Sequence, residues 1–216
     1  MISFEIDITT VLLFLFFGNL VTAGLLAIYS SDFIDQRTYR QFLAGKLLQS
    51  ISWMLLAMRG KIPDVLSAHL GNSLLLIGFA LEALAVISVE KPRKRWETYY
   101  AIVVVVFIFV FWTFAKQPNE YVYISSAFAA LMFLSVTIFF LRGAKKSVLR
   151  YALSVIYAVS CFILLVRSTN AFLDSDYKLM TSEFSQTLTF LSTYFLMIIS
   201  GSSFLLLQRA RTDELF

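Results

Sequence analysis

The chain has 216 residues, of which 59% are hydrophobic and 15% are charged, and its formal net charge is +4 at pH 7. Apolar segments fill most of this length, and the connections leave no room for an independently folded soluble domain, which normally needs roughly 50 residues or more. The basic excess needs no nucleic acid to explain it, because such charge is expected beside the anionic lipids of an inner leaflet. We therefore expect one membrane domain over residues 1–216, with membrane lipids as partners and no nucleic acid.

Seven apolar segments approach the length of about 20 helical residues that a bilayer core requires. In chain order, the expected spans cover residues 8–29, 41–58, 65–89, 98–115, 120–141, 150–173 and 185–207. The first has no basic residue before it and is much longer than the apolar region of a signal peptide, so we expect it to be retained. Short turns make consecutive helices antiparallel. The sequence thus predicts an all-α, integral membrane seven-helix bundle.

Basic residues between the expected spans gather on alternate sides of the membrane. With the first, third, fifth and seventh connections in the cytoplasm, that side holds twelve of them: Arg37, Arg40, Lys91, Arg93, Lys94, Arg95, Arg142, Lys145, Lys146, Arg150, Arg209 and Arg211. The outer side holds four: Arg59, Lys61, Lys116 and Lys178. Cytoplasmic loops carry an excess of Lys and Arg. The amino terminus is therefore predicted to lie outside and the carboxyl terminus inside.

Two charged residues inside the spans are predicted to pair. Lys46 and Glu82 each lie about two turns from the cytoplasmic end, in the second and third spans respectively. Counted from the turn that joins these spans, their depths differ by about 4–5 Å at 1.5 Å per residue. We expect an ion pair, with Gln49 as a further donor. A structural role in fixing helix register is preferred to a proton-coupled function, which stays an alternative.

A second polar group is expected in the outer half of the bundle. Arg167 lies near the outer end of the sixth span, at a depth similar to one turn of the third. An arginine fork suits a carboxylate or phosphate, and aromatic walls with a few convergent polar groups are typical of small-molecule sites. The predicted ligand site comprises Arg167, Asn170, His69, Asn72, Trp53 and Tyr123. It suits a small anionic or amphipathic ligand, such as a lipid head group or a fatty acid.

Simpler structural roles exist for the two most distinctive of these side chains. Arg167 can reach the outer head groups, or pair with Asp7 or Glu183, instead of binding a ligand. A single imidazole such as that of His69 is more often a hydrogen-bonded residue inside a bundle than a ligand or a proton carrier.

The sequence contains no pattern typical of a catalytic site. It has no HExxH motif, no glycine-rich phosphate loop and no pair of intramembrane aspartates. The single cysteine, Cys161, cannot form an internal disulfide and is expected to be a packing residue. No lysine lies in the middle of the seventh span, where a retinal Schiff base would need one. We expect neither a metal nor another cofactor.

Several segments resemble the amino-terminal membrane region of bacterial GGDEF proteins. They are WMLLAMRGKIPD over 53–64, GNSLLLIG over 71–78, LVR over 165–167, and a seventh span that continues past the interface, without glycine or proline, to TDEL over 212–215. The resemblance implies a sensory input module placed before a diguanylate cyclase. The catalytic GGDEF domain is not in these residues, so the chain itself is not expected to be an enzyme.

The expected function is that of a bacterial inner-membrane sensory input domain. Its last helix would report a ligand or a membrane state to a cytoplasmic output domain, such as a diguanylate cyclase, in the same chain or through a homodimer partner. Two alternatives stay open. One is a small transporter or channel that uses Lys46, Glu82 and the outer polar residues along one path, although no inverted repeat supports it. The other is a membrane assembly or chaperone subunit without a ligand.

Overall fold

A computed structural model describes residues 7–28, 35–90, 94–143, 147–174 and 184–213, and the regular elements of these ranges are all helices. Their bounds are α1 Ile8–Ile28, α2 Gln36–Ala57, η2 Val65–Leu70, α3 Gly71–Glu90, α4 Lys94–Phe114, α5 Pro118–Leu141, α6 Val148–Leu173 and α7 Phe184–Asp213. Each expected span coincides with a helix, and the short π-helical η2 forms the first turn of the third. The prediction of an all-α fold is confirmed.

The composition of the helices fits a multi-pass membrane protein. In the part of the chain that the structure describes, six helical segments are long and apolar enough to cross a membrane, and α2 is the long helix that does not qualify. The reason is its content of polar side chains, of which Lys46 and Gln49 are buried, whereas the apolar Leu47 and Ile51 are exposed.

The largest differences from the predicted spans are two helices that begin at least four residues earlier and one that ends six residues later. α2 begins at Gln36 rather than residue 41, because the Asp35 side chain accepts hydrogen bonds from the backbone N–H groups of Arg37 and Thr38. α4 begins at Lys94 rather than residue 98, and α7 continues to Asp213 rather than residue 207. The predicted spans were defined by apolar content. Helical turns that extend beyond the apolar segment therefore fall outside the predicted bounds.

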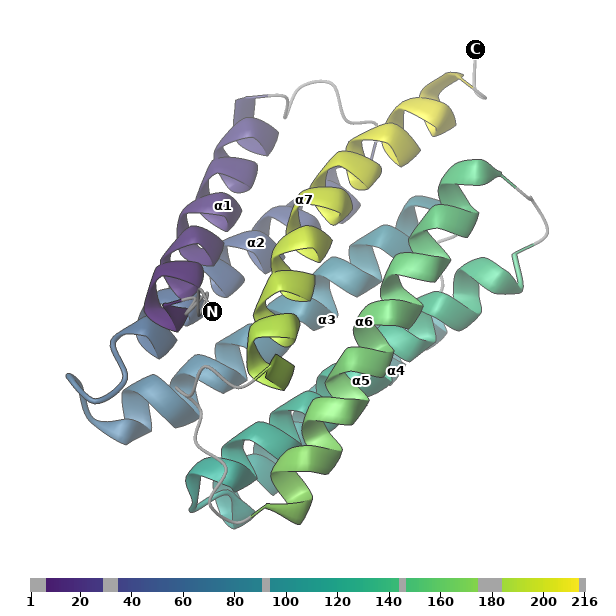
Figure 1. The fold of residues 1–216 in the computed structure, drawn as a ribbon. Coiled ribbons are helices and arrows are strands. Elements are labelled where there is room, and N and C mark those ends of the chain that lie inside the picture. The colour runs from purple at the N-terminus through teal and green to yellow at the C-terminus, as the bar shows by residue number, and fades with distance from the viewer. Residues whose placement is uncertain (1–6, 29–34, 91–93, 144–146, 175–183, 214–216) are drawn as a thin grey trace, which may run out of the picture.

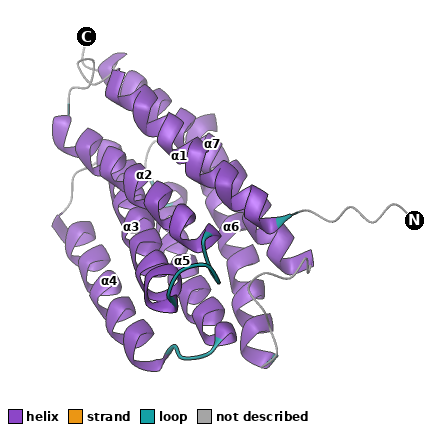
Figure 2. Ribbon diagram, turned by 90° about the vertical axis from the view of Figure 1, so that its left-hand side faces the viewer, coloured by secondary structure: helices purple, strands orange, loops and turns teal. Residues whose placement is uncertain are grey.

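The helices form an elongated bundle in which consecutive helices run in opposite directions (Figure 1). α2 packs between α1 and α3, α5 packs along α6, and α7 joins the two groups by contacting α1, α3 and α6. α4 lies at the edge of the bundle against α3 and α5 (Figure 2). Of the candidate spans, the one formed by η2 and α3 has the largest share of buried residues, and several of its buried side chains are polar.

Two glycines bring α2 and α3 into direct backbone contact. A Cβ atom on Gly45 would lie 2.9 Å from the carbonyl oxygen of Gly78, and one on Gly78 would lie 2.9 Å from that of Gly45. Such distances leave no space for any side chain. Close approach at small residues is the usual means of packing helices in lipid. The crossing lies one residue before Lys46, and it holds the two helices at the separation that the buried charges require.

Ion pairs join the helix ends on the side that we assign to the cytoplasm. Arg37 of α2 lies 2.9 Å from Glu97 of α4, with an arginine side chain that is 72% exposed. Arg150 at the start of α6 contacts Glu90 at the end of α3, and both of these side chains are largely buried. Exposed pairs contribute little to stability, so the Arg150–Glu90 contact is the more important of the two.

Candidate functional site

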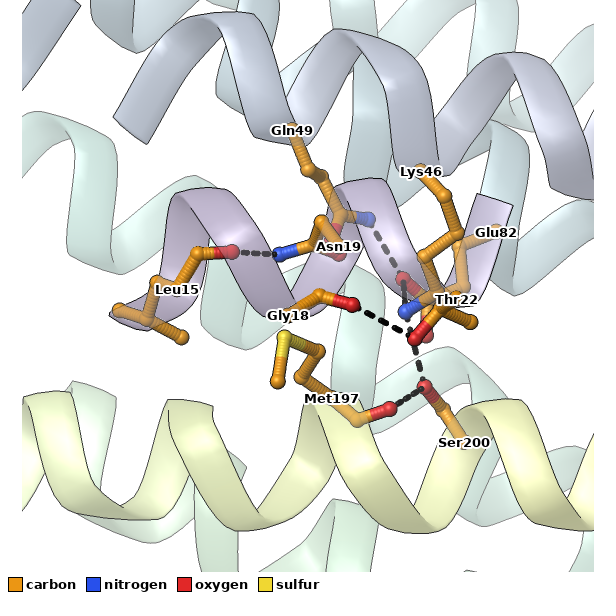
Figure 3. Close-up of polar contacts among 9 residues, drawn as sticks. All are labelled: Leu15, Gly18, Asn19, Thr22, Lys46, Gln49, Glu82, Met197 and Ser200. Carbon is orange, nitrogen blue, oxygen red and sulfur yellow. Dashed lines mark hydrogen bonds and ion pairs between the residues drawn. The ribbon is translucent and has the colours of Figure 1, made fainter. Parts of the chain in front are cut away.

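Lys46 and Glu82 meet in the middle of the bundle. The Nζ atom of Lys46 lies 2.9 Å from Oε2 of Glu82, and the two residues are 0% and 4% exposed. Gln49 donates to the same carboxylate oxygen, as expected from its place one turn along α2. The Lys46 ammonium also donates to the hydroxyl of Ser200, over 3.0 Å, and Ser200 in turn donates to the Met197 carbonyl (Figure 3). This ion-pair network therefore joins α2 and α3 to α7.

α1 borders the ion-pair network with polar and small residues. The amide of Asn19 is fully buried and donates to the carbonyl of Leu15, while its oxygen makes no hydrogen bond to any described residue. Met197 of α7 packs directly over Gly18, where a Cβ atom would lie 2.3 Å from the methionine methyl group (Figure 3). The same face of α7 that reaches Lys46 is thus fitted closely against α1.

A cavity opens between six of the helices, between the ion-pair network and the end of the bundle that we assign to the outside. Its free space is about 650 Å³ when the open mouth is included, and about 50 Å³ of this admits the centre of a water molecule. The wall is largely apolar, and it contains polar side chains from α2, α3, α5, α6 and α7. The lining residues are Leu12, Trp53, Leu56, Asn72, Leu75, Leu76, Phe79, Ser125, Ser126, Ala129, Phe133, Leu164, Arg167, Thr189, Phe190 and Thr193.

Arg167 supplies the positive charge of this cavity. Its side chain is buried, and Nη1 donates to the Ser126 hydroxyl over 3.3 Å. The guanidinium also lies over the ring of Phe190, 5.4 Å from the ring centroid. A cation that is held against an aromatic face and a hydroxyl keeps a fixed position. Arg167 therefore does not reach the outer head groups, and its alternative partner Glu183 lies outside the described residues.

Trp53 and Asn72 also line the cavity, as the sequence suggested. The amide of Asn72 donates to the carbonyl of Ala68. The indole N–H of Trp53 is buried and has no acceptor among the described residues, and its ring packs edge-on against Phe190. A buried N–H group without an acceptor is costly. These two residues and Arg167 are the members of the predicted ligand site that the structure brings together.

His69 is separated from the cavity by its own packing. Its ring is surrounded by the rings of Phe111, Trp112 and Tyr121, with centroids 5.1–5.7 Å away. Its Nε2 atom lies 3.3 Å from the carbonyl oxygen of Ala115. The residue belongs to η2, whose wider turn directs His69 toward α4 and α5 while Asn72, in the next turn, lines the cavity. The simpler role, a hydrogen-bonded histidine inside the bundle, is the one that the structure shows.

Tyr123 and Asn170 do not join the cavity either. The ring of Tyr123 packs edge-on against Phe172, and its carbonyl accepts a hydrogen bond from Ser168. Asn170 is exposed. It lies three positions after Arg167, so the two side chains are about 60° apart around α6; Arg167 is buried and Asn170 is exposed.

The outer end beside His69 contains a second arginine. Arg59, in the turn between α2 and η2, lies over the ring of Tyr121 at 5.1 Å from the centroid. Burial lowers the pKa of its guanidinium, and the Asp64 carboxylate opposes this by favouring the charged form. The two arginines of the outer half thus have separate surroundings, and only Arg167 lines the cavity.

Several hydroxyl residues of the site were not identified from the sequence, and three of them illustrate why. Ser126 holds Arg167, Thr189 lines the cavity, and Ser200 accepts from Lys46. Serine and threonine occur throughout these helices, mostly donating to a carbonyl of their own helix, so their presence alone does not mark a site. A signal does exist for α7: residues 189, 193, 197 and 200 follow a spacing of four, four and three, which places them on one face.

Comparison of the chain with protein-family models, with curated proteins and with solved structures gave no match.

Proposed function

We propose that the protein is a bacterial inner-membrane sensory input domain, in which a ligand in the outer cavity changes the position of α7. The observation that supports this is the role of one face of α7. Thr189 and Thr193 line the cavity, Met197 packs on Gly18, and Ser200 accepts a hydrogen bond from Lys46. The helix then continues without a break to Asp213. A cytoplasmic output domain, such as a diguanylate cyclase, would receive the movement.

The packing indicates which helices would move. α5 and α6 are in contact along their lengths, and so are α2 and α3, whereas α7 has fewer contacts with each group. A ligand shifts the equilibrium between two states only by the difference in its affinity for them. A ligand between Arg167 and the α7 residues Thr189 and Phe190 acts at this looser boundary. A coupling of about 1–3 kcal/mol is typical for such a change.

The cavity ends on an aromatic floor, which supports a sensor rather than a transporter. Phe79 and Phe133 are in edge-to-face contact, with centroids 5.2 Å apart, and both line the cavity. Phe133 also packs edge-to-face against Tyr157, with ring centroids 5.5 Å apart. Phe79 lies one turn before Glu82 on α3, so we infer that these rings lie between the cavity and the ion-pair network. A transporter would have to part them, so this function is the weaker candidate.

The orientation of the bundle gives the first prediction. We propose seven spans, with α2 among them, an outer amino terminus and a cytoplasmic carboxyl terminus. A reporter fused after Gly143, between α5 and α6, should be active in the cytoplasm. One fused after Asp174, at the end of α6, should be active in the periplasm. The physical reason is the excess of basic residues around the first position. If both fusions report the same side, α6 does not cross the membrane; exchanged results would reverse the orientation.

The second prediction tests the movement of α7 without any ligand. Ala129 is buried in the cavity wall on α5, and Ala129→Phe should fill part of the cavity. With Cys161→Ala as background, spin labels at Val148 and Arg209 mark the cytoplasmic ends of α6 and α7, where both side chains are exposed. We expect Ala129→Phe to change the distance between the labels by about 1–2 Å, the size of a typical helix shift.

The control pair for this measurement is Leu141 and Val148, which are exposed at the adjoining ends of α5 and α6. Their separation should stay constant, because these two helices pack along their lengths. An equal change in both pairs would indicate general loosening of the bundle. An unchanged Val148–Arg209 distance in a folded Ala129→Phe variant would contradict the proposed function.

A further inference from the structure

We propose that the adjoining ends of α4 and α5 form a binding site for an anionic phospholipid whose head group carries two phosphates, such as cardiolipin. The site lies at the end of the bundle that we assign to the cytoplasm, where lipid head groups of the inner leaflet meet the protein. It uses a different surface from the cavity and does not involve α7. The inference therefore goes beyond the proposed function and is tested separately from it.

Aromatic contacts bring the start of α4 and the end of α5 together. The ring of Trp96 in α4 packs edge-on against Phe139 in α5, with centroids 5.9 Å apart. One turn deeper, the hydroxyl groups of Tyr100 and Ser135 are hydrogen-bonded over 2.6 Å. Trp96 is half-buried, and tryptophan is enriched at the depth of the lipid head groups. The two helix ends are therefore held side by side at the membrane interface.

Three cationic residues, which we call the α4–α5 basic cluster, lie at this contact. Lys94 and Arg95 come directly before Trp96, and Arg142 follows Phe139 by three residues, or about 4.5 Å along the helix axis. The side chains of all three are exposed. Positive charge is thus concentrated at head-group depth on two neighbouring helices.

The acidic residues at this end of the bundle are paired with other arginines. Glu97 of α4 lies 2.9 Å from Arg37 of α2, and Glu90 at the end of α3 contacts Arg150 of α6. Among the residues that the structure describes, no acidic side chain forms an ion pair with any member of the α4–α5 basic cluster. Three positive charges are therefore left for an anion from outside the bundle.

The number and placement of these charges favour a head group with two phosphates. A phosphodiester carries one negative charge, and its oxygens accept hydrogen bonds from guanidinium and ammonium groups. One phosphate would leave two of the three cations without a partner, whereas two phosphates can contact both helix ends at once. Basic pockets between helices on the cytoplasmic side are known to bind cardiolipin head groups. Deeper in the membrane, α4 and α5 expose Ile102 and Ile138, which suit the acyl chains.

The test measures lipid binding to the purified full chain by native mass spectrometry from an uncharged detergent. The probes are cardiolipin, phosphatidylglycerol and phosphatidylcholine with the same acyl chains. Each Lys or Arg near an anionic lipid contributes about a fivefold gain in affinity. Cardiolipin should therefore bind at least tenfold more tightly than phosphatidylglycerol, and phosphatidylcholine should not compete. Equal affinity for cardiolipin and phosphatidylglycerol would overturn the two-phosphate head group.

Variants test the location of the site. Lys94→Gln, Arg95→Gln and Arg142→Gln should each weaken cardiolipin binding about fivefold, and the triple variant about a hundredfold. Arg142→Lys keeps the charge and should retain most of the affinity. Arg209→Gln is the matched control, because Arg209 is an exposed cation at the same end of the bundle but on α7. It should leave cardiolipin binding unchanged.

Two further outcomes would overturn the proposal. An equal loss in Arg209→Gln would show that cardiolipin is attracted to the whole basic face, without a site at α4 and α5. Binding without preference among the three lipids would leave the α4–α5 basic cluster with a role in topology alone. The variants should unfold at the same temperature as the natural sequence when no lipid is added, because exposed charges contribute little to stability. Neither outcome affects the proposed movement of α7, which the spin-label distances test.

Discussion

Glu82→Gln should lower the free energy of unfolding by about 3–5 kcal/mol, the usual cost of removing one partner from a buried ion pair. The substitution keeps the size of the side chain but leaves the Lys46 ammonium, which is 0% exposed, with the Ser200 hydroxyl and a neutral amide. Lys46→Met should have a cost of similar size, because Glu82 then keeps only the Gln49 amide. Unfolding by sodium dodecyl sulfate in mixed micelles measures both changes.

The double variant distinguishes the interaction energy of the ion pair from the separate effects of the two substitutions. Lys46→Met with Glu82→Gln removes both charges, so it should recover part of the loss that each single substitution causes. Arg37→Ala is a matched control, because the exposed Arg37–Glu97 pair has similar geometry and should contribute no more than about 1 kcal/mol. Additive losses in the double variant would show that Lys46 and Glu82 have independent partners, contrary to the structure.

Gly45→Ala should destabilise the bundle by about 2–3 kcal/mol, a cost at the upper end of what overpacking usually causes. The new methyl group would meet the carbonyl oxygen of Gly78 at 2.9 Å and the backbone nitrogen of Glu82 at 3.1 Å. Backbone atoms cannot move aside as a side chain can, so α2 and α3 must separate. The separation should also weaken the Lys46–Glu82 contact, which lies beside this crossing. Thermal unfolding of the purified protein measures the loss.

Gly24→Ala is the matched control for this helix crossing. No heavy atom lies within 4 Å of the added methyl group at Gly24. In a helix, alanine is favoured over glycine by up to about 1 kcal/mol, so this variant should be neutral or slightly more stable. If Gly45→Ala were equally harmless, the close contact between α2 and α3 would not be present in the folded protein.

The Lys46–Glu82 contact was predictable because its two helices share a short turn. Counting residues from that turn gives the depth of each side chain, and a short turn leaves little freedom in register. Ser200 shows the limit of such counting: α7 is not a sequence neighbour of α2 or α3, so nothing in the sequence fixes its depth relative to Lys46. The structure supplies this register through packing, including Met197 on Gly18.

The outer site shows a second limit, which concerns rotation rather than depth. Arg167, His69 and Asn170 were placed together because they lie at similar depths, but depth does not determine the face of a helix. Asn170 lies about 60° around α6 from Arg167 and is exposed. His69 lies in the π-helical turn η2, which the apolar pattern of the sequence does not predict. Arg167 and Asn72 face inward and share the cavity.

The central claim is that a ligand in the outer cavity is detected by α7. Its most direct test is a pair of cryo-electron microscopy structures of the protein in lipid nanodiscs, one of the natural sequence and one of Ala129→Phe. We predict a displaced α7 from Thr189 to its cytoplasmic end in the variant, while α5 and α6 keep their relative positions. An α7 that is unchanged beside the filled cavity would contradict the account.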